Sequence, residues 1–106
     1  MINVMIYMND DAEVTQLTMD GHADYDEYGK DLVCAGASAV VIGGINAIMK
    51  LSDDTPTLDM DEERGFIDIK PFDIHDDKSQ LILQTIIVSL VTIQESYGEF
   101  INIQYK

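Results

Sequence analysis

The chain has 106 residues, of which 46% are hydrophobic and 25% are charged. This length and composition predict one globular domain, residues 1–106, whose folding buries roughly two thirds of the unfolded chain's surface. Twenty acidic side chains against six basic ones give a net charge of −14, which argues against direct binding of nucleic acid or anionic membranes, because both require Lys and Arg. A basic partner or substrate suits this charge better.

The N-terminal part of the sequence predicts a β-hairpin followed by a loop and a helix. Apolar and polar residues alternate over 2–8 and again over about 13–21, with turn-forming residues at 9–11 between them. The polar stretch 22–31 has no sustained periodicity, which is typical of a loop. Asp31 is suited to a helix N-cap, so a helix is expected from about Leu32 to Leu51.

The C-terminal part predicts a second hairpin and a second helix, followed by a closing strand. Leu58 and Met60 indicate a short strand, residues 61–65 a turn, and residues 66–71 the returning strand. A second helix is expected over roughly 76–97, with Gly98 as its C-cap, before a closing strand over 100–105. The order β-β-α-β-β-α-β predicts an α+β fold with a mostly antiparallel sheet packed against two long helices.

The sequence also bears on the cellular compartment. Cys34 is the only cysteine, so no internal disulfide is possible. The first residues carry no basic region ahead of the apolar ones, unlike a signal peptide. The stretch from Leu81 to Ile93, read as the longest apolar segment, is too short and too polar to span a bilayer. These features predict a cytoplasmic protein.

Two features of the expected helices favour a homodimer. Small residues recur every four positions in the first helix, at Ala35, Ala39, Gly43 and Ala47. This ridge would let another backbone approach closely, although packing inside the chain's own fold is the simpler interpretation. The second helix is apolar around most of its circumference between residues 81 and 93. One sheet covers a single stripe of a helix, so a second surface is needed, and a symmetric dimer would provide it.

Cys34 is the first candidate for chemistry. If Asp31 is the N-cap, Cys34 becomes the third helical residue, next to unpaired backbone N–H groups and the positive end of the helix dipole. That environment favours the nucleophilic thiolate, and the same N–H groups could hold an oxyanion. The alternative is a small, buried and inert side chain.

His22 is the candidate partner of Cys34. It follows the second expected strand, and a strand end and a helix start can meet at one edge of a sheet. Neutral imidazole is a suitable base for a thiol near pH 7. The alternative is a solvated loop histidine, because strand alternation places His22 on the polar face. His75, close to several aspartates, is expected to be a solvated turn residue.

Several neighbouring residues could support this pair. Asp31 is better suited to capping the helix than to orienting His22 as the third member of a triad. Ser38, one helical turn after Cys34, could bond near the site or back to its own helix. The loop is either a solvated surface or a lid for a basic peptide, and its acidic and aromatic residues are Asp24, Tyr25, Asp26, Glu27, Tyr28 and Asp31. The sequence has no metal-ligand spacing, so neither a metal nor another cofactor is expected.

Two segments resemble the signature of the ribosomal-processing cysteine proteases: Gly21-His22-Ala23, and the run from Tyr28-Gly29 through Cys34 to Ser38. The run 81–85 and the closing strand are similar to that family as well. The resemblance implies a homodimeric bacterial endopeptidase that removes the N-terminal extension of ribosomal protein number twenty-seven of the large subunit. His22 and Cys34 would be its catalytic pair, and the loop between them would be a flexible gate. Gly21, Asp31 and Ser38 are the candidate supporting residues, and residues 24–29 are the candidate substrate loop.

The resemblance also implies cleavage after two aromatic residues and before a small residue and lysines, which agrees with the acidic charge of this chain. Two functions are therefore considered. In the first, Cys34 attacks the scissile carbonyl, His22 moves the proton, and helix N-terminal amides, including that of Cys34, hold the oxyanion. In the second, the chain is a non-catalytic dimeric module that binds a basic partner through its acidic loop.

Overall fold

The computed structural model describes residues 1–21, 28–61, 63 and 65–106, and for residues 28–31 it describes the backbone alone. The predicted order of strands and helices is confirmed. The elements are β1 (Ile2–Met8), β2 (Val14–Asp20), α1 (Tyr28–Leu51), β3 (Thr57–Asp61), β4 (Phe66–Lys70), α2 (Asp77–Tyr97) and β5 (Ile101–Tyr105).

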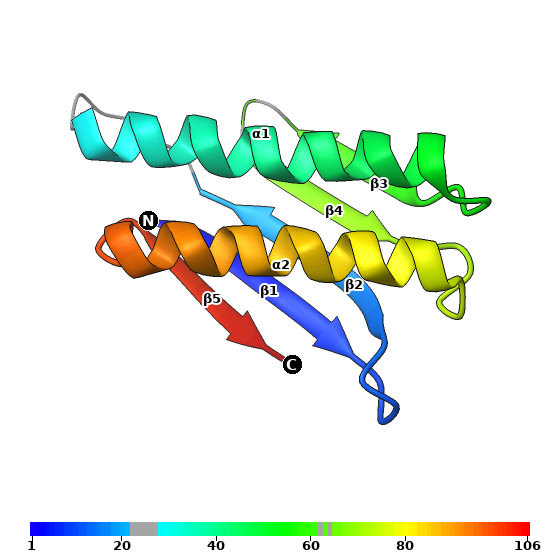
Figure 1. The fold of residues 1–106 in the computed structure, drawn as a ribbon. Helices are drawn as coiled ribbons and strands as arrows, with labels where there is room; N and C mark the ends of the chain where they lie inside the picture. The colour runs from blue at the N-terminus through cyan, green and yellow to red at the C-terminus, as the bar shows by residue number, and fades with distance from the viewer. Residues whose placement is uncertain (22–27, 62, 64) are drawn as a thin grey trace.

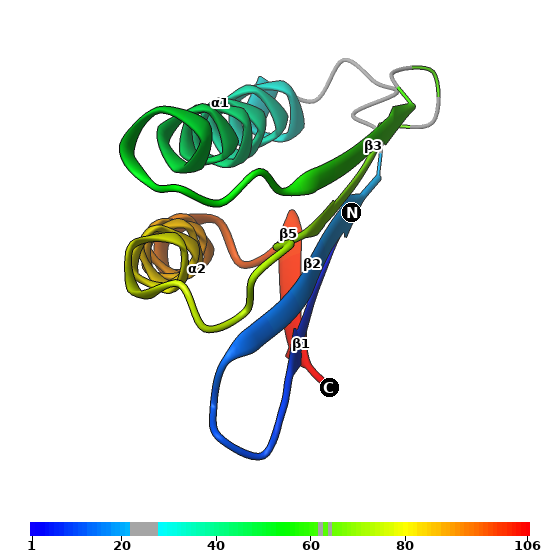
Figure 2. The same ribbon diagram turned by 90° about the vertical axis from the view of Figure 1, so that its right-hand side faces the viewer.

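The five strands form one sheet in the order β3-β4-β2-β1-β5. Strands β1 and β5 are parallel, and the other neighbouring strands are antiparallel. Both helices lie side by side on one face of this sheet and leave its other face open (Figures 1 and 2). The fold is therefore the expected α+β architecture, with a helical layer on a mostly antiparallel sheet.

Strand alternation determines which side chains form the core. Ile2, Val4 and Ile6 of β1 are buried beneath the helices, and the register of β1 with β2 places Met19 opposite Val4 and Leu17 opposite Ile6. Each large apolar side chain that is fully buried stabilises the fold by roughly 1.5–3 kcal/mol. The core continues through β4, α1, α2 and β5 as one cluster, so the sheet and both helices form a single packed unit.

Helices α1 and α2 pack closely at Gly44. A Cβ atom at this position would overlap the side chain of Ile86 on α2, which is itself buried. The predicted small-residue ridge does not serve this purpose, because Ala35, Ala39 and Gly43 are exposed. Apart from its chain neighbours and the backbone of its own helix, no atom in the described part of the chain lies within 4 Å of where a Cβ of Gly43 would be. The expectation that this ridge packs inside the chain is therefore wrong.

Helix α1 begins at Tyr28, earlier than predicted. Tyr28 and Gly29, assigned to the loop from the sequence, are helical, and Asp31 lies inside the helix, so it is not the N-cap. The sequence prediction failed here because the first turn of the helix is polar and carries no apolar periodicity.

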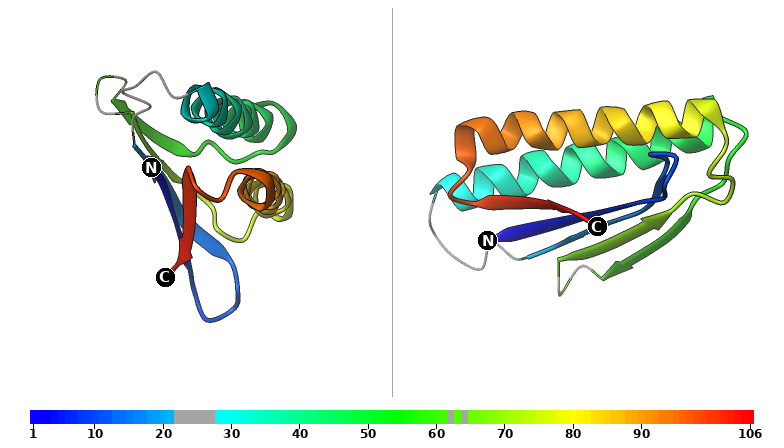
Figure 3. Two further views of the ribbon diagram at one scale, coloured as in Figure 1. Left: turned by 90° about the vertical axis from the view of Figure 1, so that its left-hand side faces the viewer. Right: turned by 90° about the horizontal axis from the view of Figure 1, so that it is seen from below.

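In the described part of the chain, the segment that stands out for its length and hydropathy is Leu32–Leu51 of α1, and not the stretch from Leu81 to Ile93 in α2 that was expected. By length and composition alone this segment is sufficient to cross a membrane. Core helices of globular domains satisfy the same criterion. One side of α1 belongs to the core through Val33, Ala37, Val41, Ile45 and Ile48, which joins it to the sheet and α2 (Figure 3).

A buried carboxylate joins the α1–β3 connection to the β4–α2 connection. Asp54, which is only 4% exposed, follows α1 and accepts hydrogen bonds from the backbone N–H groups of Phe72 and Asp73 at 3.1 and 2.9 Å. It also accepts one from the hydroxyl of Ser79 in α2 at 3.0 Å. Asp76 is the N-cap of α2 and accepts a hydrogen bond from the backbone N–H of Ser79. The start of α2 is thereby fixed to the end of α1.

Candidate active site

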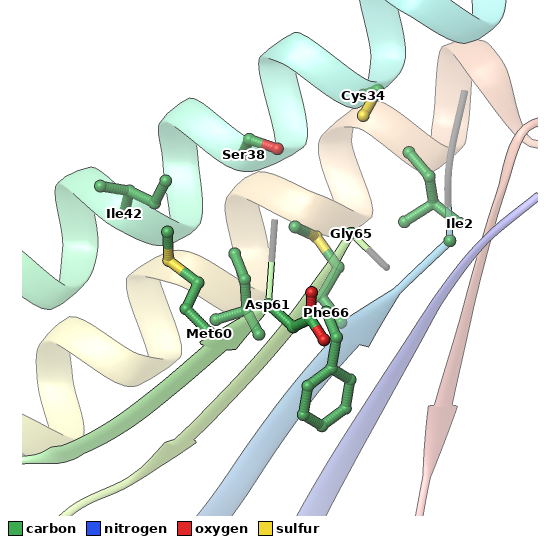
Figure 4. Close-up of a pocket in the computed structure, with 11 residues that line it drawn as sticks. Ile2, Cys34, Ser38, Ile42, Met60, Asp61, Gly65 and Phe66 are labelled. Carbon is green, nitrogen blue, oxygen red and sulfur yellow. The ribbon is translucent and has the colours of Figure 1, made fainter. Parts of the chain in front are cut away.

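A pocket of about 220 Å³ lies between α1 and the sheet, beside the β3–β4 hairpin. One wall is the N-terminal half of α1, and the others come from the ends of β1 and β2 and from the hairpin (Figure 4). The lining residues are Ile2, Met19, Gly21, Cys34, Ser38, Ile42, Met60, Asp61, Gly65, Phe66 and Ile67. This set combines mainly apolar walls with a thiol, a hydroxyl and the carboxylate of Asp61.

The structure places Cys34 and Ser38 together, one helical turn apart on the pocket wall. Cys34 is a free thiol and is partly exposed. In the described part of the chain, the Ser38 hydroxyl makes no hydrogen bond. The hydroxyls of Thr85, Ser89 and Thr92 differ, since each donates to a carbonyl of its own helix. The Ser38 hydroxyl therefore does not bond back to the backbone and is available to a bound molecule.

Gly21, which directly follows the end of β2, also lines the pocket. Its φ of 123° lies in the region that favours glycine. A Cβ atom here would overlap the carbonyl oxygen of Met1 and lie 2.9 Å from the Cα of Ile2. This close approach to the start of β1 brings the residue that precedes His22 to the same pocket as Cys34. His22 itself lies outside the described residues, as do Asp24, Tyr25, Asp26 and Glu27.

The position of Cys34 within its helix differs from the prediction. Because α1 begins at Tyr28, Cys34 is the seventh helical residue and not the third. Its backbone N–H lies beyond the first four unpaired N–H groups of the helix and belongs to the helical hydrogen-bond ladder. The proposal that this amide holds an oxyanion is therefore wrong. The side chain of Cys34 still faces the pocket.

His75 is remote from this pocket. The segment just before α2, which contains His75, lies at the end of the helical layer away from the start of α1, the helix that contains Cys34 (Figure 1). The His75 side chain is 72% exposed, as predicted, and its Nδ1 is 2.8 Å from the Glu13 carboxylate. The hydrogen bond with Glu13 and the charge of Glu13 raise the pKa of His75. The pKa of Glu13 is lowered, chiefly by a hydrogen bond from Asn9 and then by the one with His75.

The apolar walls were not identified from the sequence. Ile42 of α1 and Met60 of β3 point toward each other across the pocket, while the ring of Phe66 points away from α1 (Figure 4). These residues come from three separate elements, and only the packing of the hairpin beside α1 brings them together. Among the described residues, no group of three or more His, Cys, Asp or Glu side chains is arranged to hold a metal ion.

Comparison with known proteins identifies the family. The sequence model described as cysteine protease Prp matches residues 1–102. The chain belongs to the Prp family of cysteine proteases. It is 51% identical, over the full length of both chains, to the ribosomal processing cysteine protease Prp of Staphylococcus aureus. It is 36% identical to the protein of the same name from Bacillus subtilis, over 97% of this chain and 96% of that one.

Solved structures agree with this assignment. A crystal structure of the S. aureus Prp protease with a substrate peptide superimposes with a TM-score of 0.95 at 50% identity, covering all of both chains. A second, with a covalently linked product peptide, gives a TM-score of 0.92 at 51% identity, also over both full chains. The Prp-family chain is therefore an enzyme, a cysteine protease, and the non-catalytic binding module considered above is excluded.

Proposed function

We propose that this protease removes the N-terminal extension of ribosomal protein number twenty-seven of the large subunit, with Cys34 as its nucleophile and His22 as its base. One observation carries the catalytic part: the only cysteine of the chain lines the pocket that Gly21 also lines. A cysteine protease requires a thiol nucleophile, and a chain with a single cysteine offers no other candidate than Cys34.

The same reasoning supports His22 as the base. The chain has two histidines, and His75 is bound to Glu13 away from the pocket. His22 directly follows Gly21, whose backbone forms part of the pocket. His22 would take the proton of the Cys34 thiol as sulfur attacks the scissile carbonyl, and would then give that proton to the leaving amine. Water would hydrolyse the resulting thioester and release the second product and the free thiol.

Ser38 replaces the Cys34 amide as the proposed hydrogen-bond donor to the substrate. Its hydroxyl lines the pocket one turn from Cys34, without a hydrogen-bond partner among the described residues. A donor at this place would stabilise a carbonyl oxygen as negative charge develops on it. Asp31 is not the helix N-cap, and orientation of His22 is the other role proposed for it.

The substrate assignment is supported by charge, by pocket chemistry and by the named relatives. Ribosomal proteins are basic, and this chain has a net charge of −14. The pocket walls at Ile42 and Met60 are suited to the large apolar residues expected before the scissile bond. The two named relatives are both ribosomal processing proteases. A ribosomal precursor as substrate would also place this enzyme in the cytoplasm.

The decisive experiment uses a peptide with two aromatic residues before the scissile bond and lysines after it. We expect the wild-type protein to cleave this peptide, and Cys34→Ala, Cys34→Ser and His22→Ala to lose cleavage while keeping the far-UV circular dichroism of the wild type. Iodoacetamide should modify Cys34 rapidly near pH 6.5 in the wild type and slowly in His22→Ala. Cleavage by Cys34→Ala at the wild-type rate would refute the mechanism. Cleavage of a control peptide without the aromatic pair at the same rate would refute the substrate assignment.

We further propose that two copies associate through their helical layers. Between Leu32 and Met49 in α1, and between Ser79 and Gln94 in α2, the sequence contains no charged residue, although the chain is highly charged elsewhere. Leu81 and Val88 on the outer side of α2 are 69% and 63% exposed. Such an uncharged helical surface suits a second copy of the same surface.

Sedimentation analysis tests the dimer. The wild type should be dimeric at micromolar concentration, and Val88→Glu should be monomeric or precipitate, because two buried carboxylates would face the dimer axis. Tyr105→Glu on β5, which lies outside the helical layer, is the matched control and should remain dimeric. A soluble wild-type monomer at micromolar concentration would contradict the proposed association.

A further inference from the structure

The free edge of β3 lies directly beside the candidate active site. Among the described residues, β3 pairs with β4 on one side and has no strand on its other side. Every residue of β3 except Asp61 is exposed. Its last two residues, Met60 and Asp61, line the pocket that contains Cys34. Among the described residues, no strand pairs with the outer backbone N–H and C=O groups of 57–60, and this stretch of the edge leads toward the active site.

The helix-facing side of this edge is apolar and incompletely covered. Leu58 and Met60 lie opposite the buried residues Ile69 and Ile67 of β4, so their side chains are on the face that the helices occupy. They nevertheless remain 43% and 40% exposed. Ile42, on the facing side of α1, is also exposed and lines the pocket with Met60. Exposed apolar side chains of β3 and α1 therefore continue from the pocket, at Met60 and Ile42, along the sheet edge to Leu58, and this surface is called the apolar channel below.

We propose that the substrate binds as an additional β-strand along the free edge of β3, with alternate side chains inserted between β3 and α1. An exposed sheet edge binds an extended peptide through backbone hydrogen bonds, and pockets for alternate side chains provide specificity. The inference rests on the proposed function, because it assigns the apolar residues before the scissile bond to this channel. Leu58 and Met60 are two positions apart, so they contact substrate side chains that are also two positions apart.

Charge favours the substrate over a second copy of the chain as the occupant of this edge. Asp59 is exposed on the opposite side of β3 and lies across from Asp68 of β4. Two β3 edges paired with each other would bring aspartates of both copies close together on one face, which is unfavourable. A basic peptide meets no such repulsion. The edge is thereby protected from self-association and remains open to a positively charged strand.

N-methylation of the substrate backbone tests strand addition directly. Each methyl group removes one N–H donor and blocks close approach at that position, and in a strand the N–H groups of alternate residues point to the same side. We expect kcat/KM to fall about tenfold when the methylated N–H faces β3, and to change less than twofold at the adjacent residue. Peptides methylated at the first, second and third residues before the scissile bond should therefore show an alternating pattern.

Equal tolerance of N-methylation at all three positions would overturn strand addition, and so would an equal loss at all three. The unmethylated peptide separates this outcome from failure of the proposed function. If wild type does not cleave it, or if Cys34→Ala does, the proposed function is wrong before strand addition is tested.

A variant pair tests the side-chain part of the inference. Leu58→Thr should raise KM severalfold for a peptide with a large apolar residue at the position facing Leu58, with little change in kcat, and should not alter KM for a peptide with alanine there. Threonine is favourable in strands, so the fold should be kept. Tyr105→Thr, an exposed position on the opposite edge strand β5, is the matched control and should leave both constants unchanged. An unchanged KM in Leu58→Thr for both peptides would contradict insertion of substrate side chains beside β3.

Discussion

Gly21 links the stability of the sheet to the geometry of the active site, and Gly21→Ala should impair both. The backbone φ of 123° lies where L side chains are strained, which costs about 1–3 kcal/mol. In addition, the new Cβ would overlap the carbonyl oxygen of Met1 and lie 2.9 Å from the Cα of Ile2. Both contacts are with backbone, which relaxes only if the start of β1 moves. We therefore expect a total loss of about 3 kcal/mol in the free energy of unfolding.

For a domain of this size, that loss corresponds to a decrease of roughly 12–24 °C in Tm. Urea unfolding followed by circular dichroism, at one fixed protein concentration, measures it. Gly43→Ala is the matched control. This glycine lies within a helix and has open space around its Cβ position among the described residues. The free energy of unfolding of Gly43→Ala should therefore be higher than that of wild type by about 0.5–1 kcal/mol. Below its own unfolding transition, Gly21→Ala should still show reduced kcat/KM, because Gly21 lines the pocket beside His22. Unfolding free energies within about 0.5 kcal/mol of wild type would refute the argument from strain.

Three further predictions concern charged groups. Asp54→Ala should destabilise the chain by about 2 kcal/mol, because the buried Ser79 hydroxyl and the partly buried backbone N–H groups of Phe72 and Asp73 lose their acceptor, whereas Ser79→Ala should cost only about 1 kcal/mol in the same urea measurement. Glu13→Gln should reduce stability most between about pH 4.5 and 6.5. The raised pKa of His75 adds stability that is complete below its ordinary value of 6.5 and lost as pH rises through the folded value. The lowered pKa of Glu13 adds stability above its ordinary value of 4.5, and this stability is lost as pH falls. Equal urea midpoints for variant and wild type between pH 4.5 and 6.5 would contradict a stabilising interaction between Glu13 and His75. Neutralising Asp24, Asp26 and Glu27 together should raise KM for a lysine-containing peptide and flatten the dependence of kcat/KM on salt, and an unchanged salt slope would show that the substrate's basic residues are recognised elsewhere.

The order of elements could be predicted because local patterns determine it. Alternation in β1 and β2 and the apolar runs of α1 and α2 each fit one type of secondary structure. The parallel pairing of β1 with β5 could not be predicted in this way, because it depends on how the chain returns after α2. The early start of α1 at Tyr28 was missed because its first turn lacks apolar periodicity. The small-residue ridge was misassigned, because only the packed structure shows that Gly44, and not Gly43, meets α2.

The site could be predicted in part. The spacing between Gly21-His22-Ala23 and Cys34, which resembles that of the family, identified Cys34 and His22 as candidates. The structure places Cys34 on a pocket wall. The prediction that the Cys34 amide holds an oxyanion required a helix start at Leu32. The helix starts four residues earlier, at Tyr28, so this amide is not among the unpaired ones. Ile42 and Met60 carried no signal in the sequence, because an apolar residue in a helix or strand is usually core. Only their exposure beside a pocket shows that they are available to a substrate.

Helix α1 explains why this acidic chain contains one segment apolar enough to resemble a membrane span. Successive residues of a helix are about 100° apart, so different positions serve different neighbours. Val33, Val41 and Ile48 face the core, and the series Cys34, Ser38 and Ile42 lines the pocket with four-residue spacing. The outer side, which includes Ala39, is exposed and uncharged. A charge on the core side would be buried without a partner. A charge on the pocket side would lie beside the thiol, and a charge on the outer side would oppose the proposed association with a second helical layer. The hydropathy of α1 therefore agrees with its place against the core, with its place on the pocket wall and with the proposed association, and none of these requires a lipid environment.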